Sequence, residues 1–315
     1  MAARAFDTPI ADDGASLAGP WRAPQQMLAA QVYDGHVSIH DEAMAKKMGF
    51  KAATIEGPTH FSQFAPLGCA VWGERFLSNG CLSAHYRNPV FEGEEVQAFL
   101  RRPAEGEAQA EIWMSRTDGT EILRGTASIG PDFPASALEN RLKELTPLAD
   151  PVVLADVKLG MTSPRIPVRM DPDQNMGALY PFSLNQKLAK ITEPSAWYAG
   201  ADNPWGRALA PVEMISVLMQ YTSRGWSFPA RGPAVGLFAD QEIRLLDGPV
   251  FVGEPYEIVR EVIFMSGSRR TESMWTRSTL YAAGTDRAVA SMILNLASMK
   301  ESYARYAEEH AALYG

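Results

Sequence analysis

The pattern of apolar and polar positions in the first half of the chain predicts a short helix, a longer apolar helix and then a set of β-strands. The short helix is expected over His40–Gly49, because acidic residues stand at its start and a glycine at its end. Gly57-Pro58 then opens an apolar helix that reaches Val71, and Pro66 is expected to kink or interrupt it. Segments with strand-like patterns follow at Cys81–Tyr86, Glu94–Arg101, Ala108–Ser115 and Ile122–Ile129.

The second half repeats this order of elements. Pro194–Ala199 is expected to form a short helix, and Pro211–Arg224 a long apolar one. A polar amphipathic helix over Ser302–Tyr314 should end the chain. Between them, strands are predicted near Gly236–Leu246, Pro255–Met265, Arg270–Ala282 and Ala288–Ala297.

A short sequence motif also occurs twice. Asn88-Pro89-Val90-Phe91-Glu92-Gly93-Glu94 returns 160 positions later as Gly248-Pro249-Val250-Phe251-Val252-Gly253-Glu254. Matches that keep their order and spacing indicate duplication of one structural unit. Each unit should therefore fold as one helix wrapped by its own antiparallel sheet, and the two sheets should pair edge to edge.

This duplication divides the 315 residues into an α+β chain of two similar units. The stretch between the units is rich in Pro and Asp, a composition typical of linkers. The expected parts are a tail or covering segment 1–26, a first unit 27–132, a linker 133–175, a second unit 176–300 and a C-terminal helix 301–315.

Composition narrows the classes of function. A formal net charge of −8 argues against a general nucleic-acid-binding protein, which needs a basic face. No apolar run approaches the roughly 20 residues that span a bilayer, and the first residues lack the apolar core of a signal peptide. Cys69 and Cys81 are the only cysteines and are read as reduced packing groups. We therefore expect a cytoplasmic protein without membrane or nucleic-acid partners.

The segment Tyr33–Phe50, with its Asp-Gly-His-Val-Ser-Ile-His core, resembles the signature of MaoC-like (R)-specific enoyl-CoA hydratases. The downstream motif Tyr86–Glu94 is similar to the strand that follows the central helix in that family. With the internal repeat, the resemblance covers roughly residues 27 to 298. It implies a double hotdog fold and a hydratase or dehydratase acting on an α,β-unsaturated acyl substrate, carried as a CoA thioester. It implies no bound cofactor.

The match to the family signature is incomplete. His40 falls on the family's catalytic histidine position. The register of the family's aspartate holds Gly35, with Asp34 one residue away. The family's His-Gly step into the central helix is Glu56-Gly57 here. The second unit lacks the histidine altogether, because the aligned position is Glu193.

Addition of water to an enoyl thioester needs acid/base groups and donors for the thioester oxygen. His40 and Asp34 are the candidates for the acid/base pair, and the turn from Gly57 through Thr59 to His60 could hold the oxygen at a helix start. The two halves of the duplication need not both be active, so a single site at the first helix entrance is expected. Trp197 and Tyr198 of the second unit could line the acyl pocket or cover the core.

Other residues keep alternatives open. His36 stands four residues before His40, but this pair lacks a third metal ligand, so no metal site is expected. Glu213 or Glu56 could serve a hotdog thioesterase that hydrolyses acyl-CoA, and His60 could be a base or a satisfied helix-entry residue. A non-catalytic acyl-binding protein is the third reading. A small acyl substrate and a second copy of the chain are the expected partners.

Overall fold

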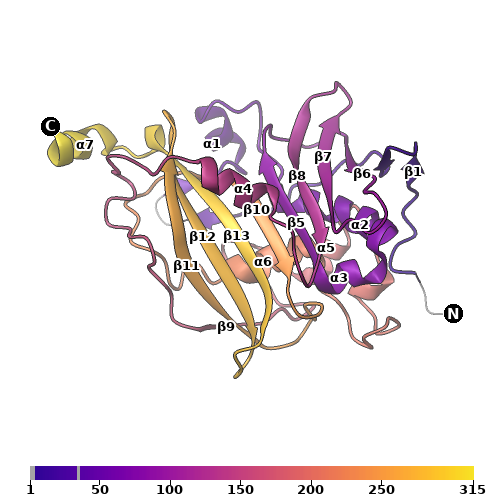
Figure 1. Ribbon diagram of the computed structural model, residues 1–315. Helices are drawn as coiled ribbons and strands as arrows, with labels where there is room; N and C mark the ends of the chain where they lie inside the picture. The colour runs from indigo at the N-terminus through magenta and orange to yellow at the C-terminus, as the bar shows by residue number, and fades with distance from the viewer. Residues whose placement is uncertain (1–3, 34–35) are drawn as a thin grey trace.

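The computed structural model describes residues 4–33 and 36–315, and a single antiparallel sheet of eleven strands is its largest feature (Figure 1). The eight strands predicted from the sequence are all confirmed, four in each unit. In spatial order the strands are β1 (Ala11–Asp12), β2 (Ser16–Ala18), β6 (Val96–Arg101), β7 (Gln109–Arg116), β8 (Glu121–Ile129), β5 (Gly80–Tyr86), β10 (Gly236–Leu245), β13 (Ala288–Met299), β12 (Thr271–Ala282), β11 (Tyr256–Gly267) and β9 (Ile166–Val168).

Strands β5 and β10 join the two units into one sheet, as the duplication predicts. They run antiparallel, with Cys81 opposite Arg244 and His85 opposite Asp240. This pairing satisfies the backbone groups of two strands that would otherwise be open edges. The double hotdog arrangement expected from the sequence is therefore present.

The central helix of the first unit has two parts. A 3₁₀ segment η1 (Gly57–Phe64) passes into the α-helix α2 (Ala65–Trp72), and Pro66 stands in the first turn of α2. The predicted interruption at Pro66 is confirmed, because a proline suits a new helix start better than a helix interior.

The second unit's central helix is α6 (Val212–Gln220), which packs beside η1. A hydrogen bond from Ser62 Oγ to Glu213 Oε1, 2.8 Å long, links the two helices. Both lie behind the sheet in the view of Figure 1. The apolar residues of each helix are thus covered by the sheet that follows it in the chain.

Segments outside the two predicted units also carry structure. In the N-terminal segment, β2 pairs with β6 and extends the sheet. In the expected linker, the helix α4 (Ala137–Glu144) starts with a capping box formed by Ser136 and Glu139. The Leu138 N–H of α4 donates to Ser83 Oγ of β5 over 3.1 Å. Because Leu82 beside it packs into the main core, α4 must cover the opposite face of the sheet.

Smaller elements complete the chain. A two-stranded ribbon, β3 (Val32–Tyr33) and β4 (His36–Val37), precedes α1 (Glu42–Lys47), whose N-cap Asp41 accepts from the Met44 N–H. None of the helices within residues 4–33 and 36–315 has the length and apolar character needed to cross a bilayer. The remaining short helices are η2 (Gly73–Arg75), α3 (Phe76–Asn79), α5 (Leu184–Leu188), η3 (Ala196–Tyr198) and η4 (Lys300–Ser302).

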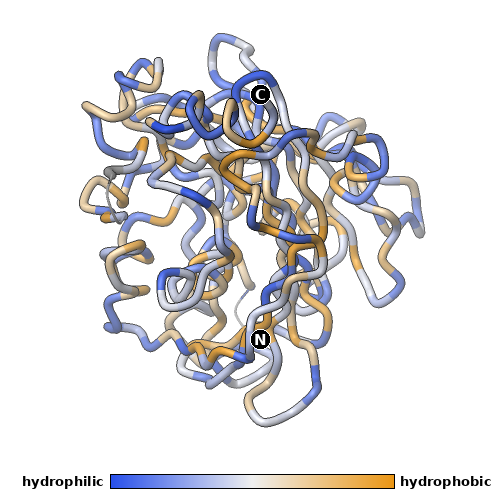
Figure 2. Tube along the Cα trace, turned by 90° about the vertical axis from the view of Figure 1, so that its left-hand side faces the viewer, coloured by the Kyte–Doolittle hydropathy of each residue, from blue (hydrophilic) through white to orange (hydrophobic). Residues whose placement is uncertain are grey.

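The main apolar core lies between the sheet and the central helices. It contains Phe61, Phe64 and Leu67 of the first helix and Met214 and Leu218 of the second, all buried. In Figure 2 the apolar stretches run through the inside of the trace, and the polar stretches lie mainly on the outer loops. One continuous core therefore spans both units and holds the two helix starts in fixed positions.

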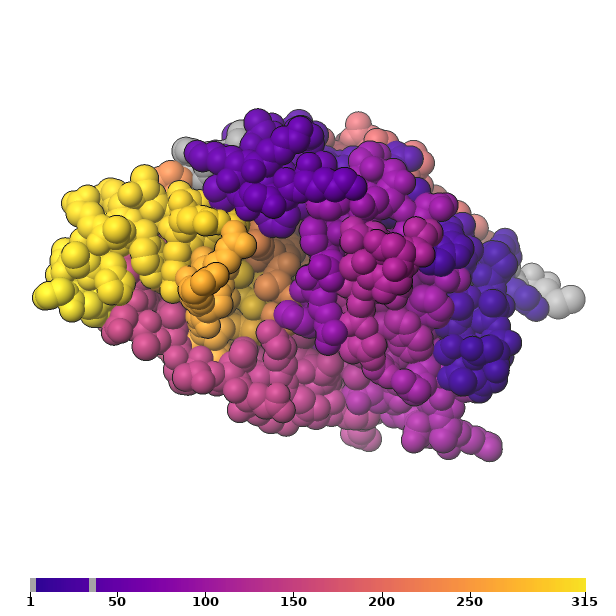
Figure 3. Space-filling model, turned by 90° about the horizontal axis from the view of Figure 1, so that it is seen from above, coloured from indigo at the N-terminus to yellow at the C-terminus, as the bar shows by residue number. Residues whose placement is uncertain are grey.

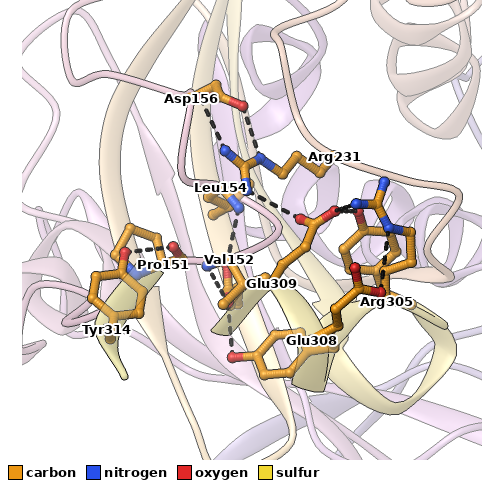
Figure 4. Close-up of polar contacts among 12 residues, drawn as sticks. Pro151, Val152, Leu154, Asp156, Arg231, Arg305, Glu308, Glu309 and Tyr314 are labelled. Carbon is orange, nitrogen blue, oxygen red and sulfur yellow. Dashed lines mark hydrogen bonds and ion pairs between the residues drawn. The ribbon is translucent and has the colours of Figure 1, made fainter. Parts of the chain in front are cut away.

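The C-terminal helix α7 (Tyr306–Tyr314) lies at the far end of the second unit and is held by polar contacts (Figure 4). Arg231 forms ion pairs with Asp156 at 2.8 Å and with Glu309 of α7 at 3.0 Å. The Tyr314 hydroxyl donates to the Pro151 carbonyl over 2.7 Å. This helix fastens the segment that connects the units and does not reach the central helices.

Candidate active site

A cavity of about 240 Å³ lies at the start of the first unit's central helix. Both units line it, because Tyr180 and residues 236–239 belong to the second. In the space-filling view of Figure 3, the segment that carries α1 lies across the boundary between the two units. The wall combines apolar side chains such as Ile55, Ile122 and Phe238 with several polar groups. Such a mixed wall suits a ligand with a polar reactive end and an apolar remainder.

His40 lines this cavity from the turn that precedes α1. Its Nδ1 lies 2.8 Å from the Thr54 carbonyl oxygen. Because a carbonyl can only accept, Nδ1 must carry the proton, and Nε2 is then the basic nitrogen. Burial lowers the pKa of His40 below 6.5, while the Thr54 contact and the Glu56 charge act in the opposite direction. The imidazole is therefore neutral at pH 7 and fixed in one tautomer.

Gly57 lines the same cavity as the first residue of η1. A backbone N–H at a helix start has no partner within its own helix and carries partial positive charge. A side chain is excluded here, since a Cβ on Gly57 would lie 2.7 Å from Cζ of Tyr86. The Tyr86 hydroxyl is held by Gln241 Oε1 at 2.9 Å. The glycine thus allows the aromatic ring to pack directly against the helix start.

His60 is buried and also lines the cavity. Burial and the nearby Lys187 charge lower the pKa of His60 to about 4. Within the part of the chain that the structure describes, its Nδ1 has no hydrogen-bond partner. A neutral imidazole beside the helix start can donate a hydrogen bond to a ligand or accept one from it. With a pKa this low, it is a poor base at pH 7.

A buried ionic cluster lies next to the cavity and connects the two units. Lys187 of α5 is 3.1 Å from Glu56 Oε1 and 2.9 Å from Glu213 Oε2, and it donates to Thr59 Oγ1 over 2.9 Å. The two carboxylates raise the pKa of Lys187 against the effect of burial, so its ammonium stays charged. Burial raises the pKa of Glu213. Of the cluster's members, Glu56 lines the cavity, whereas Thr59 and Glu213 do not.

The remaining candidates of the second unit lie elsewhere. Trp197 is fully buried and packs with Ile191 and Leu209 in a separate apolar cluster. Tyr198 belongs to the same cluster and does not line the 240 Å³ cavity. Glu193 is buried against the N-terminal segment, where Arg22 lies 2.7 Å from its Oε1. These three residues cover the core of the second unit rather than the cavity.

The last two candidates of the first unit are Asp34 and His36. Asp34 lies outside the described residues, so the predicted pairing of Asp34 with His40 stays a prediction. His36 is described as part of the β4 strand, where it pairs with Tyr33. Among the described residues, no three His, Cys, Asp or Glu side chains gather as ligands of a metal ion would.

The sequence reasoning missed three residues of this region. Tyr86 and Tyr180 line the cavity, and Lys187 holds Glu56. Tyr86 begins the motif Tyr86–Glu94 that resembles the family's strand, and this resemblance was the available signal. A single lysine in a short polar helix gives no sign that it will be buried.

The second unit has a smaller counterpart of the cavity. In both units a backbone N–H just before the helix donates to the strand motif, from Ile55 to Val90 in the first and from Ala210 to Val250 in the second. Ala210 and Val250 line a separate cavity of about 30 Å³ that has mainly apolar walls. This space is too small and too apolar to match the first.

Comparison with known proteins supports the fold. No protein-family model matches the chain, and no curated protein matches it. A Chloroflexus aurantiacus J-10-fl protein assigned to the MaoC domain dehydratases is 12% identical, with a TM-score of 0.53 over 94% of this chain and 95% of that one. A conserved hypothetical protein from Mycobacterium tuberculosis with a double hotdog fold is 13% identical, with a TM-score of 0.54 over 93% and 96% of the two chains.

A further solved structure, described as a MaoC-like dehydratase, is 14% identical. Its TM-score is 0.50, over 91% of this chain and 97% of that one. At these identities the likenesses show a shared fold. The resemblance read from the sequence is therefore confirmed as a double hotdog fold of the kind found in MaoC-like dehydratases.

Proposed function

We propose that this chain is a hydratase or dehydratase that adds water to, or removes it from, an α,β-unsaturated acyl thioester. The observation that carries the proposal is the meeting of His40 and Gly57 at one cavity. His40 supplies a neutral imidazole of fixed tautomer. Gly57 supplies a helix start whose backbone N–H can stabilise negative charge. The fold shared with MaoC-like dehydratases supports the same class of reaction.

In the hydration direction, His40 Nε2 takes a proton from water while the water oxygen bonds to Cβ of the substrate. The π electrons move through Cα to the thioester oxygen, where the N–H of Gly57 stabilises the developing charge. The imidazolium of His40 then returns a proton to Cα, and the charge on oxygen collapses back into the carbonyl. Dehydration is the reverse sequence.

The acyl group of the proposed substrate is carried as a CoA thioester. The chain has an acyl-sized cavity with apolar walls, and a thioester carbonyl placed at Gly57 would leave the acyl chain facing Ile55, Ile122 and Phe238. The predicted Asp34 would add a second acid/base group to this site. No bound cofactor has a role in the proposed reaction.

A substrate panel tests the proposal. Purified protein is incubated with short and medium trans-enoyl-CoA and saturated acyl-CoA thioesters, and both double-bond absorbance and free thiol are recorded. We expect the enoyl absorbance to fall without release of thiol. Thiol release from saturated substrates would instead identify a thioesterase. No change in either readout would favour a non-catalytic acyl-binding protein.

The geometry favours the hydratase over the thioesterase. Glu213, the acid that a thioesterase would use, faces Ser62 and Lys187 and does not line the cavity. Glu56 does line it, but its Oε1 is held by Lys187. A carboxylate fixed in this way is poorly placed to attack a thioester as a nucleophile.

A further inference from the structure

The first unit's helix start carries a carboxylate that the proposed mechanism does not use. Glu56 immediately precedes Gly57, is buried, and lines the same cavity as His40. A carboxylate in such a place must be paired or it is costly to bury. Its partner is Lys187, at 3.1 Å, which comes from the other unit.

We propose that Glu56 is a second catalytic group of this cavity, orienting the attacking water beside His40, and that Lys187 is the positioning residue that fixes it. The inference rests on the proposed hydratase reaction and names one more residue of that site. It also explains why a buried lysine should reach across from α5 to the start of η1.

The contacts of Lys187 explain why Glu56 can keep its place. The ammonium is bound on three sides, by Glu56, Glu213 and Thr59. Thr59 belongs to η1 and Glu213 to the first turn of α6, so the lysine is itself fixed by both central helices. Lys187 therefore has little rotational freedom left and holds Glu56 in one position. A group that orients a reactant must be fixed in this way.

The charge of Glu56 also reaches the proposed base. Within residues 4–33 and 38–315, the titratable or charged side chains on the cavity wall are Tyr33, His40, Glu56, His60, Tyr86, Arg87 and Tyr180. Of these described groups, Glu56 is the charged one that raises the pKa of His40. When His40 takes the proton of water, the Glu56 carboxylate stabilises the imidazolium without taking the proton itself. The proton still travels from water through His40 to Cα, so the reaction remains balanced.

The two glutamates that share Lys187 provide a matched pair of variants. Glu56→Gln leaves a Lys187–Glu213 pair, and Glu213→Gln leaves a Lys187–Glu56 pair. Each variant removes one negative charge and keeps one buried ion pair, so both should fold. They differ in whether the lost charge faced the cavity.

The test measures kcat and KM for an enoyl-CoA substrate across pH in the wild type and both variants. We expect Glu56→Gln to lower kcat about 100-fold, the lower end of the effect of an acid/base group. Its acidic limb should shift to lower pH, because His40 loses the charge that raised its pKa. Glu213→Gln should keep kcat within about tenfold and leave the acidic limb in place. Equal effects of the two variants would overturn the proposal.

Lys187 is tested with the double variant Lys187→Gln/Glu213→Gln, which removes one charge of each sign. We expect kcat to fall below that of Glu213→Gln alone, and the acidic limb to move toward that of Glu56→Gln, because without its cation the buried charge of Glu56 becomes costly. A double variant with the kcat of Glu213→Gln would show that Lys187 does not position Glu56. Should Glu56→Gln fail to fold, Glu56→Asp keeps the charge but shortens the side chain, and should lower kcat without moving the limb.

A measurement without substrate separates this inference from the proposed function. The imidazole of His40 is titrated by NMR in the wild type and in Glu56→Gln, and its signal is assigned by its absence in His40→Gln. We expect a lower pKa of His40 in Glu56→Gln. If the wild type hydrates enoyl-CoA but this pKa does not move, the role of Glu56 fails and the proposed function stands. If no enoyl-CoA reacts, the proposed function fails, whatever the titration shows.

Discussion

Replacing Gly57 by alanine should disturb the cavity in a way that can be worked out from the structure. The new Cβ would lie 2.7 Å from Cζ and 2.9 Å from Cε2 of Tyr86. Carbon atoms prefer about 3.5–4.0 Å, so the ring must move by nearly 1 Å. Overpacking of this kind costs about 1–3 kcal/mol, and weakening the Tyr86–Gln241 hydrogen bond adds about 1 kcal/mol.

The expected loss in the free energy of unfolding is therefore about 2–4 kcal/mol, or about 3–6 °C in Tm for a chain of this size. Because the N–H of Gly57 would shift with the helix start, kcat should fall as well, by up to about 100-fold. Thermal unfolding and the enoyl-CoA assay measure the two effects. Gly19→Ala is the matched control, since its Cβ would meet nothing closer than the Ala98 carbonyl at 3.8 Å.

A double-mutant cycle decides whether the cause is the tyrosine. Tyr86→Ala removes the ring, so Gly57→Ala should cost less stability in that background than in the wild type. Additive losses, or an unchanged Tm in Gly57→Ala, would refute the reasoning that this glycine exists to admit the ring.

Three further predictions concern titration and packing. The acidic limb of kcat/KM should fall below pH 6.5, because burial lowers the pKa of the proposed base His40; a limb above pH 6.5 would contradict this. The pKa of His60 is about 4 in the folded protein, against 6.5 for a solvent-exposed histidine, so the contribution of His60 to stability should be fully present above pH 6.5. From there toward pH 4 it should be lost, by up to about 1.4 kcal/mol per pH unit. Urea unfolding at pH 7 and pH 5 should show this slope in the wild type and a flatter one in His60→Asn. Trp197→Ala should lower the free energy of unfolding by about 3–5 kcal/mol and leave the acyl chain-length preference unchanged, because the indole is fully buried away from the cavity; a changed preference would place Trp197 at the substrate.

The sequence was informative wherever a pattern is repeated or periodic. The strands of both units, the helix break at Pro66 and the β5–β10 junction follow from alternation, proline chemistry and the internal repeat. Strands β2 and β9 were not foreseen, because three residues are too few to show a period. The capping box Ser136-x-x-Glu139 did carry a signal for α4, but the surrounding Pro and Asp favoured a linker.

The candidate site could be predicted only in part from the sequence, for a different reason. His40 and Gly57 could be found because the resemblance gives them a register, and the structure places both at one cavity. Contacts between the units depend on how the duplicated sheets close on the helices, and no local pattern encodes that. Lys187 and Glu56 are 131 positions apart, and Trp197 stands near the helix entry in sequence yet packs in a separate cluster.

The most direct test of the central claim compares activity with stability in His40→Ala. The imidazole makes one hydrogen bond to the backbone, so its removal should change Tm by only a few degrees. Enoyl-CoA hydration should fall by a factor of about 100 or more, as the loss of an acid/base group typically causes. A folded His40→Ala protein that hydrates enoyl-CoA at the wild-type rate would contradict the account, and unfolding of the variant would show that His40 is structural.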